Sequence, residues 1–181
     1  MVIRVLAITT LMAVFSICAY CADTTIKGTT SDSTASSLEV TNSANTSLIL
    51  VRNDGNVGVG TASPNTNLDI SGTFAHRRGQ IAVSAGNNNN VNVGSFTFVK
   101  ITSAANNFTI TGITGGVDGR RLIIWNSTTR NMSISNESAS STAANRITTN
   151  SGGTRSTGGP GTAEFVYDTG SSRWVLTNID S

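Results

Sequence analysis

Hydrophobic positions in the chain after residue 22 recur in short alternating runs, divided by clusters of Gly, Asn, Asp and Ser. The β-branched residues Thr, Val and Ile are abundant, and no stretch of a dozen residues carries the apolar stripe of an amphipathic helix. Alternation with a period of two predicts β-strands, and closely spaced turn signals are typical of sandwiches and small barrels. The pattern predicts an all-β protein with strands near residues 38–41, 47–52, 56–60, 67–72, 80–84, 95–101, 107–111, 120–125, 131–135, 146–148, 163–167 and 173–179.

Two Asp-Gly pairs give the clearest local predictions. Asp54 and Gly55 separate two apolar runs and predict a tight hairpin, because this pair tolerates the positive φ angles that such turns require. Asp118 and Gly119 form the second pair and lie just before the run Leu-Ile-Ile-Trp at 122–125. The continuous apolar character of that run predicts a strand buried on both faces.

The first residues have the layout of a secretory signal peptide. Arg4 precedes an apolar stretch from Val5 to Tyr20, and small residues follow before Asp23. We therefore expect residues 1–22 to be removed and the mature protein to be secreted, extracellular or on the cell surface. A spanning helix and lipidation of Cys21 are the alternatives, although the apolar stretch is short for the first and bulky Tyr20 fits the second poorly.

The remaining chain predicts two parts that meet at the sequence Phe-Ala-His-Arg-Arg-Gly of residues 74–79. Residues 23–75 contain few large apolar side chains, too few to bury a core of their own, so this part is expected to be stabilised by copies wrapping around each other. Residues 79–181 are expected to form a β-sandwich or jelly-roll-like head. Its predicted core includes Trp125, Phe165, Tyr167 and Trp174.

The surface is predicted to be covered by hydroxyl and amide groups. Charged residues make up only 12% of the chain, whereas Ser, Thr and Asn together account for 69 of its 181 residues. The formal net charge is +2, without basic runs, which argues against a nucleic-acid partner. Both cysteines, Cys18 and Cys21, fall at the signal segment, so disulfides and thiolate chemistry are not expected in the mature chain.

Two sets of motifs resemble fibre proteins. The stretch from Val51 to Pro64, Val-Arg-Asn-Asp-Gly-Asn-Val-Gly-Val-Gly-Thr-Ala-Ser-Pro, followed by Asn-Leu-Asp-Ile-Ser-Gly at 67–72, resembles a module of phage tail fibres and large bacterial surface proteins. The C-terminal half resembles a domain of the same proteins through residues 112–120, 136–146, 166–168 and 172–174. The resemblance implies a trimeric β-structured shaft with a compact β head. The signal-like segment and the missing chaperone domain depart from phage fibres.

The sequence nominates no catalytic residue, cofactor or metal site. His76 is the only histidine and is expected to be a solvated linker residue, because Arg77 and Arg78 follow it and no acidic orienting residue is close in sequence. Asn53, Asp54 and Asn56 offer oxygen atoms, but their number and spacing do not match a calcium loop. Gly58 and Gly60 lack the third glycine of a dinucleotide fingerprint, and we expect them to permit close approach of strands around a trimer axis.

Two loops are the predicted recognition sites, since loops on a rigid β scaffold carry most recognition. One contains Asn87, Asn88, Asn89 and Asn90, and the other is the Gly-rich segment 151–161 with Arg155. An alternative is a sugar-stacking platform made by Tyr167, Asp168, Arg173 and Trp174, although alternation with Leu176 favours a core position for Trp174.

We therefore expect a secreted, non-enzymatic structural subunit of a fibre or surface appendage, which assembles as a homotrimer and mediates adhesion. Its partners would be further copies of itself, in a trimer or a longer filament, and a surface glycan. A soluble carbohydrate-binding module is the alternative. A polysaccharide-degrading enzyme like some tail spikes is less favoured, because the acidic residues are too scattered to nominate a glycosidase pair.

Overall fold

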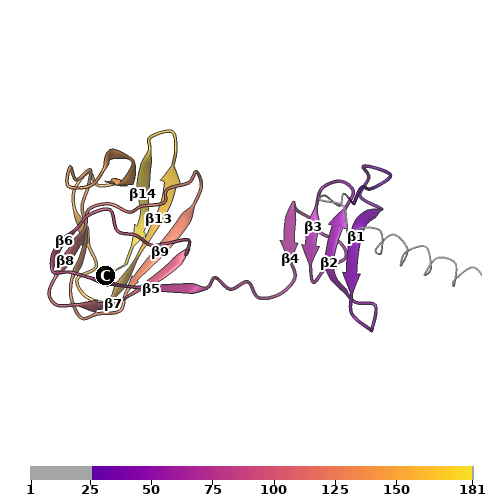
Figure 1. The fold of residues 1–181 in the computed structure, drawn as a ribbon, viewed down its shortest axis with the longest axis horizontal. Helices are drawn as coiled ribbons and strands as arrows, with labels where there is room; N and C mark the ends of the chain where they lie inside the picture. Colours follow the sequence, from indigo (N-terminus) through magenta and orange to yellow (C-terminus); the bar gives the residue numbers. More distant parts are fainter. Residues whose placement is uncertain (1–25, 181) are drawn as a thin grey trace, which may run out of the picture. The chain divides into compact units, whose positions relative to one another are not determined.

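The structure is a computed structural model that describes residues 26–180, so the predicted signal peptide with Cys18 and Cys21 lies outside the described residues. The described chain is all-β, as predicted, with a single 3-10 turn, η2 (Ala143–Asn145), between strands. It divides between Phe74 and Ala75 into an N-terminal unit and a C-terminal unit (Figure 1). No helix in residues 26–180 is long and apolar enough to cross a membrane.

The N-terminal unit contains a single four-stranded sheet with the strand order β1-β2-β3-β4 (Figure 1). Its strands are β1 (Ser36–Thr41), β2 (Ser47–Arg52), β3 (Val57–Val59) and β4 (Leu68–Ile70). The first three strands pair in antiparallel fashion, whereas β3 and β4 are parallel. Leu50 is the only fully buried large apolar side chain of the described part of this unit.

The predicted hairpin at Asp54 and Gly55 is confirmed. It joins β2 to β3, with Val51 opposite Val57. The backbone N–H of Gly55 donates to the carbonyl of Arg52 at 3.0 Å, and Gly55 has a φ of 97°. Asp54 is not among the residues with positive φ. The connection is therefore a three-residue loop that requires glycine at one position only. Asp54 instead accepts hydrogen bonds from the Arg52 guanidinium at 2.6 and 2.9 Å.

The C-terminal unit consists of two sheets. The six-stranded sheet has the order β11-β14-β13-β9-β7-β5, and the four-stranded sheet has the order β12-β10-β8-β6. The strands are β5 (Arg78–Val83), β6 (Gly86–Asn88), β7 (Phe98–Ala104), β8 (Phe108–Ile110), β9 (Arg121–Asn126), β10 (Met132–Ile134), β11 (Ile147–Thr149), β12 (Arg155–Ser156), β13 (Gly161–Asp168) and β14 (Arg173–Ile179).

The first six of these strands alternate between the two sheets. β5, β7 and β9 lie side by side and parallel in the larger sheet, and β6, β8 and β10 do the same in the smaller one. The chain thus winds three parallel coils before β13 and β14 add antiparallel strands beside β9. Of the two predicted forms, this is a sandwich, because a jelly roll is built from antiparallel strands.

The core of the C-terminal unit lies between its two sheets. The larger sheet contributes Ile101, Leu122, Ile124, Phe165, Trp174 and Leu176, and the smaller one contributes Phe108, Ile110, Met132 and Ile134. Tyr167 is also buried in this cluster. Three of the four aromatic residues that the sequence assigned to the core therefore lie in it.

The fourth, Trp125, does not belong to the core, and its strand is not buried on both faces as expected. In β9, Leu122, Ile124 and Asn126 are buried, whereas Ile123 and Trp125 on the opposite face are half-buried. Asn126 fills the interior position at the end of the strand, where its amide donates to the carbonyls of Arg130 and Gly159 at 2.7 and 2.8 Å. The run is continuous in hydrophobicity, but strand alternation still places its last tryptophan on the outer face of the sheet.

Candidate functional site

The predicted asparagine loop is tied into the fold. Asn87 and Asn88 belong to β6, and the Asn88 amide donates to the carbonyls of Ser84 and Gly86 at 3.0 and 3.1 Å. Thr111 donates to Asn89 Oδ1 at 2.7 Å. These hydrogen bonds hold Asn88 and Asn89 in the first coil, and the recognition role that the sequence predicts for them stays a prediction.

Asn90 joins the first coil to a distant segment of the C-terminal unit. Its Oδ1 accepts hydrogen bonds from the backbone N–H and hydroxyl of Thr142 and from the Asn145 amide, at 2.9, 2.6 and 2.9 Å. The residue has a φ of 50°, a conformation that asparagine tolerates better than most side chains. This, too, is a structural use of an amide that the sequence assigned to recognition.

The two predicted recognition segments do not form one site. Residues 87–90 line a hollow with the half-buried Ile81 and Val83 of β5. Arg155 lines a different one, with Ser151 and residues 176–179 of β14. Arg155 and Asn87 are both exposed. In the described part of the chain, no charged partner or aromatic face lies beside both of them.

Trp174 is the centre of a buried cluster rather than an exposed sugar platform. It is 0% exposed, and its Nε1 donates to the carbonyl of Ile113 at 2.8 Å. Tyr167 packs edge-on against it at 5.3 Å between ring centroids and donates its hydroxyl to the carbonyl of Ala144 at 3.1 Å. The Arg120 guanidinium lies over the indole ring at 5.8 Å from its centroid. Residues from four separate segments of the chain therefore meet around one core tryptophan.

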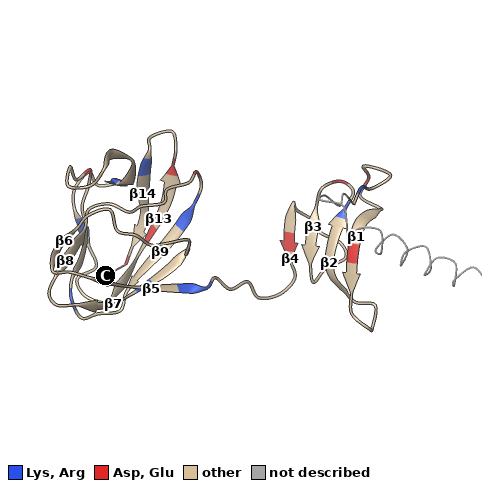
Figure 2. Cartoon of the chain, in the orientation of Figure 1, with Lys and Arg blue, Asp and Glu red and all other residues tan. Residues whose placement is uncertain are grey.

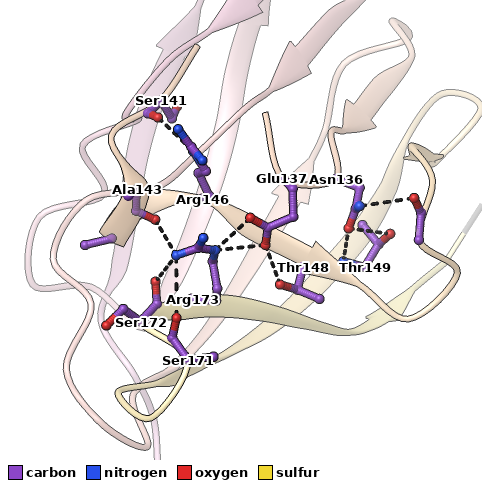
Figure 3. A network of polar contacts seen from close by, with 12 residues as sticks. Asn136, Glu137, Ser141, Ala143, Arg146, Thr148, Thr149, Ser171, Ser172 and Arg173 are labelled. Atoms are coloured by element: carbon purple, nitrogen blue, oxygen red, sulfur yellow. Dashed lines mark hydrogen bonds and ion pairs between the residues drawn. The ribbon is translucent and has the colours of Figure 1, made fainter. Parts of the chain in front are cut away.

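Beside this cluster, Arg173 and Glu137 form an ion pair (Figure 3). Arg173 Nε donates to both Glu137 oxygens at 2.8 Å, and Thr148 Oγ1 donates to Oε1 at 2.7 Å. Partial burial alone would raise the pKa of Glu137, but the hydrogen bonds from Thr148 and Arg173 and the nearby arginine charges hold that pKa below its usual value. Arg173 also donates to the carbonyl of Ala143 at 2.8 Å, so the pair fixes the connection that contains η2.

The N-terminal sheet gathers most of its aliphatic side chains on one face, while Leu48 and Leu50 of β2 lie on the other. The pairings place Leu38, Val51, Val57 and Leu68 in one row across the four strands, and Val40, Ile49, Val59 and Ile70 in the next row of the same face. Five of these eight are exposed, from 37% for Val59 to 60% for Leu68, and the other three are half-buried. We call this set the aliphatic face.

The aliphatic face contains no charged residue. Figure 2 shows acidic bands on β1 and β4, which are Glu39 and Asp69. The pairings put both in the row of Leu50 and Gly58, on the opposite side of the sheet. An isolated sheet that exposes such a face to water is marginal, and larger exposed apolar patches mark interaction surfaces. The sequence predicted a dependence on copies, but only the strand register shows that the side chains share one face.

Contacts within the chain itself explain the glycines at position 58, in β3, and position 60, just after it. A Cβ at Gly58 would lie 2.4 Å from the carbonyl oxygen of Thr61. Gly60 has a φ of 72°, and a Cβ there would lie 2.8 Å from the carbonyl oxygen of Ser71. The expected close approach around a trimer axis is therefore not needed to explain either residue.

The acidic residues and the histidine of the described part of the chain do not gather into a metal site. No group of three or more His, Asp, Glu or Cys that could hold a metal ion occurs in residues 26–180. His76 is exposed, and its Nδ1 lies 2.5 Å from Thr97 Oγ1 at the start of the C-terminal unit. Asp118 accepts a hydrogen bond from the backbone N–H of Thr169 at 2.9 Å, and Gly119 has a φ of 70°, so this pair is a turn.

Comparison with protein families and with curated protein sequences finds no match for this chain.

Proposed function

We propose that this protein is a secreted, non-enzymatic structural subunit of a fibre or surface appendage, which assembles as a homotrimer through its N-terminal sheet and mediates adhesion through its C-terminal unit. The observation that carries the proposal is the aliphatic face. Its two rows of aliphatic side chains lie side by side without a charge, which is the composition of an interface core.

Self-association also fits the rest of the chain. Closed symmetric assemblies are the commonest way to cover one apolar surface with copies of itself. The low charge of the chain, 12% of residues, provides little repulsion between copies. The fibre-protein motifs at 51–64 and 67–72 span β3, β4 and the loop between them, which is part of the same sheet.

The test is the mass of the full chain in solution, measured by light scattering after size exclusion. We expect three times the chain mass of 18.7 kDa, or three times the mature mass if residues 1–22 are removed. Val59→Lys places a charge in the centre of the aliphatic face and should shift the mass toward that of one chain.

Val117→Lys is the matched control, because Val117 is 66% exposed in the C-terminal unit and the substitution is chemically identical. It should leave the mass unchanged. A wild-type chain that runs as a monomer at all concentrations, or equal effects of the two substitutions, would contradict the proposal. Val59→Thr, which keeps the shape of the side chain, separates loss of assembly from loss of folding.

A further inference from the structure

The outer face of the six-stranded sheet contains a hollow of about 280 Å³. Phe98 of β7 lies opposite Ile123 of β9, and Ile123 lies opposite Glu164 of β13, so these three form one row across the sheet. All three line the hollow, together with Arg121, which lies two residues before Ile123 on the same face. The hollow thus has an apolar floor, and Arg121, Glu164 and the imidazole-bearing His76 are among the residues that line it.

The apolar floor continues into an aromatic surface. Trp125 lies two residues after Ile123 on the same face and stacks on Phe98, with 6.4 Å between ring centroids and 16° between ring planes. Lys100 Nζ lies 4.5 Å from the centroid of the Trp125 ring. Trp125 is half-buried and lies beside the hollow without lining it.

The ionic groups of the hollow are available for a ligand. Within residues 26–180 the ion pairs are Arg52 with Asp54 and Arg173 with Glu137. In that part of the chain neither the Glu164 carboxylate nor the Arg121 guanidinium has a side-chain hydrogen bond or ion pair. A carboxylate and a guanidinium on the walls of an apolar pocket are the few placed polar groups that orient a small ligand.

We propose that this hollow binds one pyranose ring of a glycan. A sugar ring has a face of C–H groups, which packs on aromatic and aliphatic side chains because the C–H edge is positive and the ring face is negative. Phe98, Ile123 and Trp125 provide that surface. The sugar hydroxyls, which are both donors and acceptors, bond to the Glu164 carboxylate and the Arg121 guanidinium. In the proposed function, a glycan would be the ligand through which the protein adheres. Only the biological use of this site rests on that proposal.

Size and charge favour a sugar over a second copy of the chain. A hollow of about 280 Å³ accommodates a single ring rather than a protein surface. Lys100 lies over the Trp125 ring, and Arg121 and Glu164 line the hollow, whereas charged residues are depleted in the core of protein interfaces. The aliphatic face of the N-terminal unit, without any charge, shows the contrasting composition.

The experiment applies the full chain to a glycan array and then titrates the best-binding glycan against purified protein by calorimetry. Trp125→Ala and Glu164→Gln should each weaken binding by about tenfold or more, as expected when an aromatic contact or a charged hydrogen-bond partner of a ligand is removed. Glu39→Gln, in the N-terminal unit, is the matched control and should leave the affinity unchanged. Because Trp125 and Trp174 are the only tryptophans and Trp174 is 0% exposed, bound glycan should also protect the fluorescence from iodide quenching.

Absence of binding to every glycan on the array, or equal affinity of the wild type, Trp125→Ala and Glu164→Gln, would overturn the assignment. So would a fall in assembly mass caused by Trp125→Ala without a change in glycan affinity, because that would make the face an interface between copies. The same array probed with Val59→Lys separates the two proposals. A monomer that still binds glycan supports this site alone, and an assembled wild type that binds none supports only the fibre proposal.

Discussion

At the scale of single residues, the two tryptophans occupy opposite kinds of position. Trp174 is enclosed between the sheets and has its indole N–H satisfied by a carbonyl, so it contributes to stability. Trp125 stacks on Phe98 on the outer face of the same sheet, where part of its ring meets solvent. Both lie beside apolar residues in the sequence, Trp125 after Ile124 and Trp174 before Val175. Their positions along the strand decide which face of the sheet each occupies.

Trp174→Ala should therefore lower the free energy of unfolding by about 3 to 5 kcal/mol, as truncation of a large core aromatic does. Trp125→Ala should lower it by about 1 kcal/mol or less, because half of the site is already open to water. Chemical denaturation of both variants followed by circular dichroism measures the difference. Equal losses would show that the outer face is as important for folding as the core.

Glu137 gives the chain a defined sensitivity to acid. Its pKa is below the usual value in the folded protein, so the stabilisation is present at neutral pH and is lost as the pH falls through the lowered pKa. Glu137→Gln should lower stability at pH 7 by about 1 kcal/mol, a small value because the pair is partly exposed.

The difference between the wild type and Glu137→Gln should narrow below about pH 4, near and under the ordinary glutamate pKa. Thermal melts of both proteins between pH 3 and 7 measure this. A difference that stays constant with pH would mean that the carboxylate charge is not involved.

At the scale of elements, the hairpin between β2 and β3 is the device that sets the register of the aliphatic face. Gly55 has a φ of 97°, and a Cβ there would meet nothing within 4 Å. Glycine is therefore required at this position for its backbone conformation, and not because neighbouring atoms leave no room for a side chain. A slip of one residue at this loop would turn the side chains of β3 to the other face.

Gly55→Val should destabilise the hairpin by about 1 to 2 kcal/mol, the cost of a left-handed conformation for a branched residue. We expect a reduced assembly mass, while melting of the C-terminal unit stays unchanged. Gly153→Val is a suitable control, since Gly153 also has open space around its Cα but does not have a positive φ. Unchanged assembly of Gly55→Val would mean that the loop does not control the register.

The sequence predicts secondary-structure elements correctly where the evidence lies in neighbouring residues. The all-β character and the turns at Gly55 and Gly119 follow from alternation and from Asp-Gly pairs. The parallel winding of β5 to β10 does not, because a period of two is the same for a strand with parallel or antiparallel neighbours. The sequence places Asn88 and Asn90 in a loop because polar asparagines are typical of turns. The bond from Thr142 to Asn90, 52 residues away, leaves no sequence signal, and the Asn88 amide bonds locally to the carbonyl of Ser84.

At the scale of the whole molecule, the two units differ in what holds them together. The C-terminal unit has its own core, whereas the described part of the N-terminal unit buries only Leu50 among its large apolar side chains. A unit stabilised by association gains stability with protein concentration by mass action, and a self-sufficient unit does not.

Calorimetry of the full chain should accordingly show two transitions. One should move to higher temperature as the concentration is raised, by a few degrees for each tenfold step, and the other should stay constant. Val59→Lys should abolish the concentration dependence and leave the constant transition in place. If both transitions of the wild type are independent of concentration, the N-terminal sheet is covered by something other than copies of the chain.

The three parallel coils also bear on the order in which the chain can fold as it is synthesised. Each strand from β7 to β10 pairs with one that begins about twenty residues earlier, so every coil finds its template already made when it emerges. β11 breaks this sequence, because its partner is β14, which begins 26 residues later in the chain and carries Trp174. A nascent chain can therefore wind its coils early, but its core remains open to water until β14 has been synthesised. A premature stop shortly before residue 173 would leave a wound but open product, exposed to proteolysis and aggregation.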